Sequence, residues 1–379
     1  MEYGLDVSLT IYSGGLGILA GDTMKSIGDL KAPVTGIGLL WGEGYTNQVI
    51  DDSGHAVDQY LPTNRDALVP VDVEISVPVA GKDVPCRVVR VTQHLSSTLY
   101  LIEPRDEEDR WITKRLYGGG SEDRLAQELL LGVGGVRLMR ALGKDVDVYH
   151  FNEGHAVFAG IELLNQAMAG GLDMKDALAE VKKKIVFTTH TPVKAGNEQH
   201  PIELMQKMGA DLGRSEAELE ELGGSPFNMT VAGLRMARHA NAVAQLHAET
   251  ARDMWKEVEG GAPIRGITNG VHVPTWQDAR VRAATVLDKE PAVRSRDLWT
   301  AHQRMKSELF ASIKEQTGAE LDPNCLTIGF ARRAATYKRA LLIFGDEARL
   351  EKLFAEGLQL IFSGKAHPAD GAGKEIIAQ

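Results

Sequence analysis

The chain has 379 residues and a formal net charge of −10, and 43% of its residues are hydrophobic. This length exceeds one ordinary hydrophobic core, so we expect two domains, or one large domain and part of another. The acidic balance argues against a nucleic acid or an anionic membrane as the main partner. No apolar run reaches the roughly 20 residues of a membrane helix. Cys86 and Cys325 match no disulfide framework or zinc pattern, which favours a cytoplasmic protein without a metal ion.

A glycine-rich turn near the start, Tyr12-Ser13-Gly14-Gly15-Leu16-Gly17, runs directly into a helical pattern. Lys31-Ala32-Pro33 ends that pattern, and the apolar run 34–41 then predicts a strand. Glycines at a helix N-terminus let a ligand approach backbone N–H groups, whose dipoles favour anions or polar oxygens. A tight structural turn explains the same residues, so the motif alone does not decide between the two interpretations.

Turn residues alternate with β-rich runs from about 45 to 103, which predicts an antiparallel excursion from an α/β domain. A helix is then expected from an N-cap at Ser121 to about Leu142. Two further strands, 145–151 and 185–189, end in Asn152-Glu153-Gly154-His155 and His190-Thr191-Pro192. Open α/β sheets place their ligand crevices at such carboxyl ends, so these polar residues are candidates for a site.

The region 201–259 is expected to be mostly helical, with His239 and His247 as packing or surface residues rather than metal ligands. A turn segment covers 267–276, and a helix over 295–317 leads to the start of a second domain. Strands are expected at 326–333 and 358–363, with a helix from about Thr336 between them. We therefore expect domains over 1–321 and 322–379, of which the second is too short for a doubly wound domain of ordinary size.

Six motifs follow one another along the chain: Tyr12-Ser13-Gly14-Gly15-Leu16-Gly17, Asn152-Glu153-Gly154-His155, Phe187-Thr188-Thr189-His190-Thr191-Pro192, Asn269-Gly270-Val271-His272-Val273-Pro274-Thr275-Trp276, Ala335-Thr336-Tyr337-Lys338-Arg339 and Gly364-Lys365-Ala366-His367-Pro368. Their order and content resemble the glucan (glycogen and starch) phosphorylase family in its short bacterial form. The resemblance implies an α/β protein with two Rossmann-like domains of the GT-B type and an active site in the cleft between them. It also implies a glycosyltransferase that cleaves terminal α-1,4-linked glucose from glucan or maltodextrin with inorganic phosphate, releasing glucose 1-phosphate with retention.

The resemblance assigns roles to single residues. The expected catalytic residues are His190, Arg333 and Lys338. The expected substrate ligands are Gly15, Leu16, His190, Asn269 and Tyr337. The expected contacts of the cofactor, pyridoxal 5'-phosphate acting through its phosphate group, are Gly14, Trp276 and Arg332. A guanidinium fork and a compact ammonium charge suit the phosphate that such a reaction must bind.

Each of these residues also has a plainer interpretation. Arg332 and Arg333 could form a solvated basic patch, His190 could be a satisfied core histidine, and Trp276 could simply pack. Glu153 raises the alternative of a glycoside hydrolase with paired carboxylates, but no partner carboxylate stands out. We interpret Asn152, Glu153 and His155 as residues that order the crevice behind the ligand contacts.

The resemblance is incomplete at both ends of the chain. The family's cofactor lysine follows a Ser/Gly-rich segment of the C-terminal domain; Lys365 and Lys374 do not match that motif, so the Schiff-base lysine is absent from this chain. The sequence is therefore expected to be an interior fragment that lacks the N-terminal start and most of the second domain. We expect it to be inactive alone, with strand edges prone to association, and a homo-oligomer stays open.

Two other functions remain as alternatives. A nucleotide-sugar α-glucosyltransferase of the same architecture also uses a Gly-Gly-Leu turn, although the motifs 189–192 and 335–339 argue against it. A non-catalytic glucan-binding module would bind glucan without dependence on phosphate, whereas a phosphorylase binds the two cooperatively.

Overall fold

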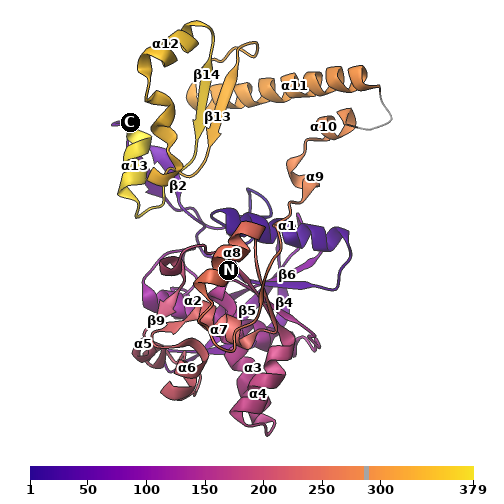
Figure 1. The fold of residues 1–379 in the computed structure, drawn as a ribbon, viewed down its shortest axis with the longest axis vertical. Coiled ribbons are helices and arrows are strands. Elements are labelled where there is room, and N and C mark those ends of the chain that lie inside the picture. The colour runs from indigo at the N-terminus through magenta and orange to yellow at the C-terminus, as the bar shows by residue number, and fades with distance from the viewer. Residues whose placement is uncertain (286–289) are drawn as a thin grey trace. The chain divides into compact units, whose positions relative to one another are not determined.

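The computed structural model describes residues 1–285 and 290–379. The chain divides into two compact units, which we describe separately (Figure 1). Unit 1 comprises Met1–Tyr45 and Pro62–Val271, and unit 2 comprises Thr46–Leu61 and His272–Gln379. The domain boundary expected near Asp322 lies inside unit 2 and stays a prediction. Within the described ranges, no helix is long and apolar enough to cross a membrane.

Two four-stranded sheets form the frame of unit 1. One is wholly parallel, in the order β12-β11-β8-β7, and the other, in the order β1-β6-β5-β4, pairs β1 with β6 in parallel and the rest antiparallel. The strands of the first are β7 (Tyr149–Asn152), β8 (Ile185–Thr189), β11 (His239–Ala242) and β12 (Ile264–Gly266). Those of the second are β1 (Thr35–Leu39), β4 (Leu68–Val79), β5 (Lys82–Val91) and β6 (Thr98–Pro104). A small antiparallel pair joins β9 (Gln199–His200) to β10 (Phe227–Asn228).

The α/β class predicted from the sequence is confirmed by these sheets and their helices. The prediction of a mostly helical 201–259 was incomplete, because β11 lies there between β12 and β8. Its sequence, His-Ala-Asn-Ala, has little intrinsic strand preference, and pairing on both sides supplies what propensity does not. By contrast, β8 has the apolar run typical of a strand buried on both faces, with Ile185 and Phe187 fully buried.

Helix α2 (Ser121–Ala141) is the central helix of unit 1 and is buried without interruption from Leu125 to Val136. It begins after Gly120 rather than Ser121, and Asp123 accepts a hydrogen bond from the Gly120 N–H at 2.9 Å. The predicted N-cap was therefore wrong by one residue. The other helices of unit 1 are α1 (Gly15–Asp29), α3 (Phe158–Ala169), α4 (Met174–Lys184), α5 (Ile202–Met208), α6 (Glu216–Gly223), α7 (Met229–Met236) and α8 (Gln245–Met254).

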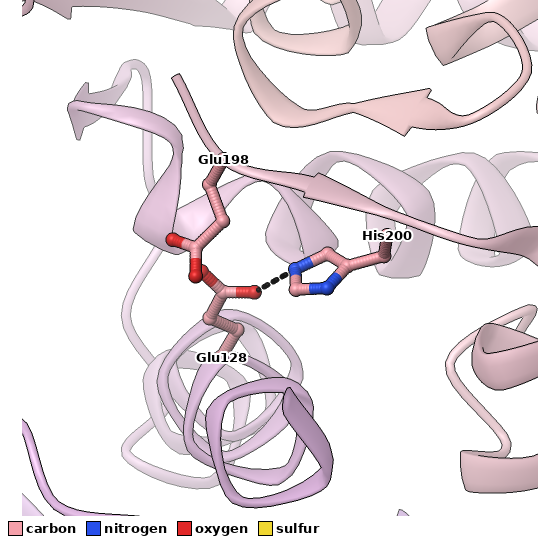
Figure 2. Close-up of side chains that lie close together, drawn as sticks. All are labelled: Glu128, Glu198 and His200. Carbon is pink, nitrogen blue, oxygen red and sulfur yellow. Dashed lines mark hydrogen bonds and ion pairs between the residues drawn. The ribbon is translucent and has the colours of Figure 1, made fainter. Parts of the chain in front are cut away.

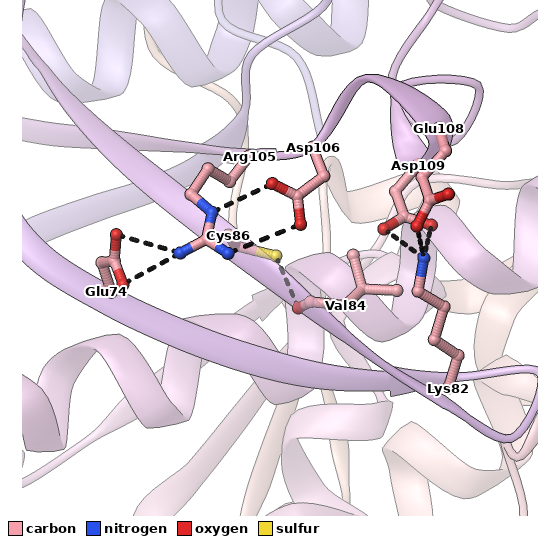
Figure 3. A network of polar contacts seen from close by, with 8 residues as sticks. All are labelled: Glu74, Lys82, Val84, Cys86, Arg105, Asp106, Glu108 and Asp109. Atoms are coloured by element: carbon pink, nitrogen blue, oxygen red, sulfur yellow. Dashed lines mark hydrogen bonds and ion pairs between the residues drawn. The ribbon is translucent and has the colours of Figure 1, made fainter.

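A polar network fastens the strands β4 and β5 to the segment after β6 (Figure 3). Lys82 donates to both carboxylate oxygens of Asp109 at 3.0 Å and also contacts Glu108. Arg105 bridges Glu74 and Asp106, at 3.2 Å and 3.0 Å. Between them the Cys86 thiol is fully buried and donates to the Val84 carbonyl, and burial raises its pKa to about 12. Cys86 is therefore an unreactive core residue.

Unit 2 combines an early hairpin with the C-terminal part of the chain. The antiparallel hairpin is β2 (Asn47–Ile50) with β3 (Ala56–Gln59), and a parallel pair joins β13 (Thr327–Ala331) to β14 (Gln359–Ser363). Its helices are α9 (Val273–Trp276), α10 (Ala279–Ala284), α11 (Pro291–Thr317), α12 (Glu347–Ala355) and α13 (Gly371–Ala378). The helix expected between β13 and β14 is present as α12, but its predicted start near Thr336 was wrong: two 3-10 turns, Thr336–Lys338 and Ala340–Phe344, meet at Arg339, whose φ of 55° no α-helix accommodates.

Long-range hydrogen bonds attach the hairpin to the C-terminal segment. Gln48 donates to the Ala366 carbonyl at 3.0 Å and accepts from the Ala366 N–H at 2.7 Å. Lys374 reaches Asp58 at 2.5 Å, and this pairing contributes to lowering the pKa of Asp58 to about 2 against the opposing effect of burial. The hairpin is thus an integral part of unit 2.

The close crossing of α2 and α3 gives a test of the fold. A Cβ at Gly132 would lie 2.6 Å from the Ala159 amide nitrogen, whereas one at Gly134 would meet only side-chain carbons, the nearest at 3.3 Å. Both substitutions to alanine gain the same helix propensity, about 1 kcal/mol. We therefore expect Gly132→Ala to unfold about 1–3 kcal/mol more easily than Gly134→Ala in urea titrations. Equal stability of the two variants would contradict the crossing.

Candidate functional site

The glycine-rich turn forms the N-terminus of α1, with Gly14 as its N-cap. A Cβ at Gly14 or Gly15 would meet nothing within 4 Å, and Gly14 is in extended backbone (φ −158°) that any residue adopts. Neither packing nor conformation therefore requires glycine at these positions. No side chain caps this end of α1, and its first turn carries no acidic residue. The open N–H groups suit an anion or a polar oxygen.

Gly17 differs from its two neighbours in the turn. A Cβ there would lie 2.7 Å from the Tyr12 Cβ and 2.8 Å from a carboxylate oxygen of Glu2. Glu2 is buried, and its carboxylate accepts the Ser13 N–H at 2.6 Å and the Tyr117 hydroxyl at 2.7 Å. A buried carboxylate thus holds the turn from behind, while the opposite side of Gly14 and Gly15 stays open.

A second group of predicted site residues meets at the carboxyl ends of β7 and β8. The Glu153 carboxylate accepts the His190 N–H at 2.7 Å and the Thr191 hydroxyl at 3.3 Å, and it is also hydrogen-bonded to the Thr191 backbone. The Thr191 N–H and the His190 C=O belong to one trans peptide and point in opposite directions, so the bond from Thr191 to Glu153 turns the His190 carbonyl away from Glu153. The backbone at Glu153 has φ 68°, a strained conformation for a residue with a side chain.

Burial sets the charge of the histidines at this edge. It lowers the pKa of His190 to about 4, with smaller contributions from His247 and His150. His190 is therefore neutral at pH 7, and its Nε2 lies 2.6 Å from Asn152 Oδ1, which assigns the ring proton to Nε2. Burial and then the nearby charge of Arg124 also hold the pKa of His155 well below its usual value. The edge is thus uncharged on its histidine side.

Of the remaining predicted residues in unit 1, Asn269 is exposed, and its N–H donates to the Val243 carbonyl at 3.0 Å, in the loop after β12. Leu16 lies in the first turn of α1. The sequence left Glu153 open as one of two acids of a hydrolase. Its carboxylate is instead hydrogen-bonded to the backbone of His190 and Thr191, which is typical of a structural role. His190 is partly buried and its Nε2 contacts Asn152 Oδ1, so the plainer interpretation of His190 as a satisfied core histidine stays open.

In unit 2 the basic residues follow the end of β13. Desolvation is the largest single effect on the pKa of the exposed Tyr337 and raises it, but the interactions with Lys338 and Arg333 together outweigh it, so the pKa is lowered. The Lys338 Nζ also lies 4.7 Å from the Tyr337 ring centroid. Arg333, Tyr337 and Lys338 therefore lie close together. Within the described residues, no carboxylate pairs with Arg332, Arg333, Lys338 or Arg339.

A hollow of about 340 Å³ adjoins these cations. Its walls are apolar side chains of β13, β14 and the 3-10 turn, and Lys338 and Arg339 stand at its lining. Arg332 donates its N–H to the Ser363 carbonyl at 3.0 Å, and its side chain is exposed. Trp276 ends the short helix α9 and is 57% exposed, so its interpretation as a buried packing residue was wrong.

A buried cluster behind the glycine-rich turn was missed by the sequence reasoning (Figure 2). Glu128, Glu198 and His200 have potential ligand atoms within 4.8 Å of one another, and Glu128 Oε2 lies 2.9 Å from His200 Nε2. A divalent cation suits such a set. However, both oxygens of Glu198 are held by the Arg124 guanidinium, at 2.6 Å and 2.8 Å, and Arg124 also lies 3.5 Å from Glu128. The cation of this cluster is Arg124.

Curated relatives match the chain over nearly its whole length. A maltodextrin phosphorylase of Thermococcus litoralis is 38% identical over 100% of the chain and 52% of the relative. A glycogen phosphorylase of Mycobacterium bovis is 37% identical over 100% of the chain and 52% of the relative, and one of Aquifex aeolicus is 33% identical over 99% and 63%. The chain belongs to the glucan phosphorylase family. It spans about half the length of the first relatives it matches, and no protein-family model matches it.

Membership of the phosphorylase family makes pyridoxal phosphate the cofactor to consider. The chemistry of the predicted contacts fits its phosphate group, since Gly14 offers an uncapped helix N-terminus and Arg332 a guanidinium without a carboxylate partner in the described part of the chain. Lys365 is committed elsewhere, because its Nζ donates to the Thr46 carbonyl, and Lys374 is bonded to Asp58. That neither of them is the Schiff-base lysine stays a prediction.

The sequence did carry a signal for the missed cluster. Arg124 and Glu128 are four residues apart on a helix whose following residues, Leu129-Leu130-Leu131, are apolar on all sides. Charges on a helix buried all round have to be paired within the protein. That argument locates the buried pair, but it does not identify Glu198 and His200, which come from a distant segment.

Glu128 makes the stability of this phosphorylase-family chain pH-dependent. Burial raises the pKa of Glu128 well above its ordinary 4.5, so the folded protein holds a proton that the unfolded chain releases as the pH rises. Its contribution is fully present at low pH and weakens above 4.5. Glu128→Gln, which mimics the protonated carboxyl, should gain in unfolding free energy relative to wild type between about pH 5 and about pH 8.

The matched control is Glu162→Gln, which removes another buried carboxylate paired with an arginine, Arg137. We expect it to lose stability at both pH values. Urea denaturation at the two pH values measures both variants, and a pH-independent difference between Glu128→Gln and wild type would refute the protonated state.

Proposed function

We propose that the native protein carrying this sequence is an α-1,4-glucan phosphorylase, a glycosyltransferase that cleaves terminal glucose from glucan or maltodextrin with inorganic phosphate and releases glucose 1-phosphate with retention. The observation that carries the proposal is the similarity to relatives named maltodextrin and glycogen phosphorylase over the whole chain. The chain spans about half of the first of these relatives, and we expect it to be inactive by itself.

Phosphate binding in this proposal belongs to unit 2. Arg333 and Lys338 supply a guanidinium fork and an ammonium point charge, and the lack of carboxylate partners within the described residues leaves both available to an anion. The adjacent Tyr337, which interacts with both cations, is proposed to bind a glucose hydroxyl. These assignments, and the shared cleft that the resemblance implies, remain predictions.

Sugar binding belongs to unit 1 in the same proposal. The N–H groups of Gly15 and Leu16 would bind glucosyl or phosphate oxygens at the open helix end, and Asn269 a glucose hydroxyl. Glycosyl transfer builds positive charge on the sugar ring. The neutral His190 adds no repulsion to that charge, and Glu153 fixes the peptide whose carbonyl would stabilise it. Asn152, Glu153 and His155 therefore serve to order the crevice.

Gly14, Trp276 and Arg332 are our proposed contacts of pyridoxal 5'-phosphate. When bound, this group would supply acid–base chemistry through its phosphate group. A cytoplasmic location, the absence of nucleic-acid and membrane partners, and a homo-oligomeric state stay predictions from the sequence.

The decisive assay uses the native protein with its cofactor. Maltodextrin plus phosphate should yield glucose 1-phosphate, and omission of phosphate should abolish product. Transfer of the glucosyl group from uridine- or adenosine-diphosphoglucose to a glucan acceptor, without phosphorolysis, would instead establish the glucosyltransferase. Glucan binding that phosphate leaves unchanged, with neither reaction, would establish a binding module.

Arg333→Ala tests the phosphate site in that assay. Loss of a charge-assisted anion contact should lower kcat/KM for phosphate about 100-fold or more, with saturation by phosphate lost and the unfolding midpoint little changed. Arg349→Ala, an exposed arginine on α12 of the same unit, is the control and should behave as wild type. Unchanged phosphate dependence in Arg333→Ala would remove Arg333 from the site.

Gly15→Ala tests the open turn, because its Cβ has room in the fold but would occupy the space of a ligand. We expect stability equal to wild type or up to about 1 kcal/mol higher, from helix propensity, together with weaker binding of phosphate and glucan. Gly17→Ala is expected instead to lower the stability, because its Cβ would collide with Tyr12 and Glu2. Thermal unfolding and isothermal titration measure the two effects, and wild-type affinity in Gly15→Ala would disprove ligand approach at this turn.

A further inference from the structure

We propose that Arg124 is a positioning residue that ties the glycine-rich turn to the segment following β8. This inference rests on the proposed function, because it concerns how the two sugar-binding segments of unit 1 are held. Arg124 lies in the first turns of α2 and is largely buried, with 17% of its side chain exposed. It touches neither segment's predicted ligand contacts directly.

On one side, Arg124 reaches the turn through two residues. Its guanidinium carbon lies 5.9 Å from the centroid of the Tyr117 ring. The Tyr117 hydroxyl donates to Glu2 Oε1 at 2.7 Å, and Glu2 Oε2 accepts the Ser13 N–H at 2.6 Å, directly before Gly14. Tyr117 has φ 57°, a conformation that persists only where the surroundings hold it. The orientation of the Ser13 peptide thus depends on the Arg124–Tyr117 contact.

On the other side, Arg124 grips the segment after His190. Its Nε and Nη2 donate to the two oxygens of Glu198, at 2.6 Å and 2.8 Å, a bidentate pair. Asn197, the preceding residue, is buried and donates to the carbonyls of Val193 and Lys194, at 3.0 Å and 3.3 Å. It also accepts the Thr230 hydroxyl at 2.8 Å. The loop 193–198 is therefore closed on itself and fastened to α2 through Glu198.

Only arginine can make both connections at once. Its planar fork binds both Glu198 oxygens while its face lies against the Tyr117 ring, and a lysine has one ammonium group for the same task. The neighbouring carboxylates raise the pKa of Arg124 in spite of its burial, so its charge is permanent. Arg124→Lys keeps the positive charge beside Glu128 and Glu198 but loses the fork, which isolates geometry from charge.

The helix also offers a matched control. Arg137 lies on the same α2, binds Glu162 through a guanidinium at 3.1 Å, and donates to the Ser76 carbonyl at 2.7 Å. Its side chain is 34% exposed, against 17% for Arg124, and within the described residues its hydrogen bonds reach neither the turn nor the loop 193–198. Arg137→Lys therefore reports what the loss of a structural arginine on α2 does by itself.

The test uses the native protein with four forms: wild type, Arg124→Lys, Tyr117→Phe and Arg137→Lys. Amide hydrogen exchange is followed in the peptides covering 13–19 and 193–198, and kcat and KM for phosphate are measured on the same samples. We expect Arg124→Lys to speed exchange about tenfold in both peptides. Tyr117→Phe, which loses only the hydroxyl link, should affect the turn alone. Both variants should lower kcat more than they raise KM for phosphate, because the cationic side chains of unit 2 that are proposed to bind phosphate are unchanged.

The two proposals fail in different ways. Exchange in both peptides that matches Arg137→Lys would overturn the positioning role, whether or not the wild type is active. An inactive wild type with faster exchange in Arg124→Lys would sink the proposed function and leave the connection standing. If Arg124→Lys does not fold, Tyr117→Phe decides alone, and unchanged exchange of its turn overturns the proposal.

Discussion

The burial of α2 on every side is the constraint from which most of unit 1 follows. This helix packs against the mixed sheet through β4 and β1 and against α3 and α5, so no face of it reaches water over its central turns. A charge placed there has to find its counter-charge inside the protein. Arg124 does so with Glu198, whereas Glu128, whose pKa is raised by burial, is hydrogen-bonded to His200. The polar network behind the glycine-rich turn is thus a consequence of how the core is assembled.

The sequence predicted the segments with a strong local pattern. The strand 185–189 was found at its observed bounds, and the helix over 295–317 was found with its observed end at Thr317. Both have an apolar or charged periodicity that local rules detect. The strand β11 and the 3-10 turns after Ala335 were missed because their form is imposed by neighbouring strands and by a left-handed residue, Arg339, rather than by propensity.

The candidate site divides in the same manner. Family motifs pointed to His190, Glu153 and the cations after β13, and the structure brings His190 to Glu153 and Arg333 and Lys338 to Tyr337. The motifs could not indicate Arg124, Tyr117 or Glu2, because these lie in three separate segments and meet only through tertiary packing. The open space at Gly14 and Gly15 likewise depends on how the rest of the chain folds around them, which a sequence motif does not encode.

The hairpin β2–β3 has a consequence for the order of events during synthesis. It belongs to unit 2, yet its partners Ala366 and Lys374 come more than 300 residues later, with separations of 318 and 316 residues. At roughly 5–20 residues per second, a ribosome needs about 15–60 s to reach them. During that interval the hairpin has left the ribosome without its cover, while the strands on both sides of it in the sequence can already join unit 1. Nascent chains of this protein therefore carry the β2–β3 hairpin without its C-terminal hydrogen-bond partners during that interval.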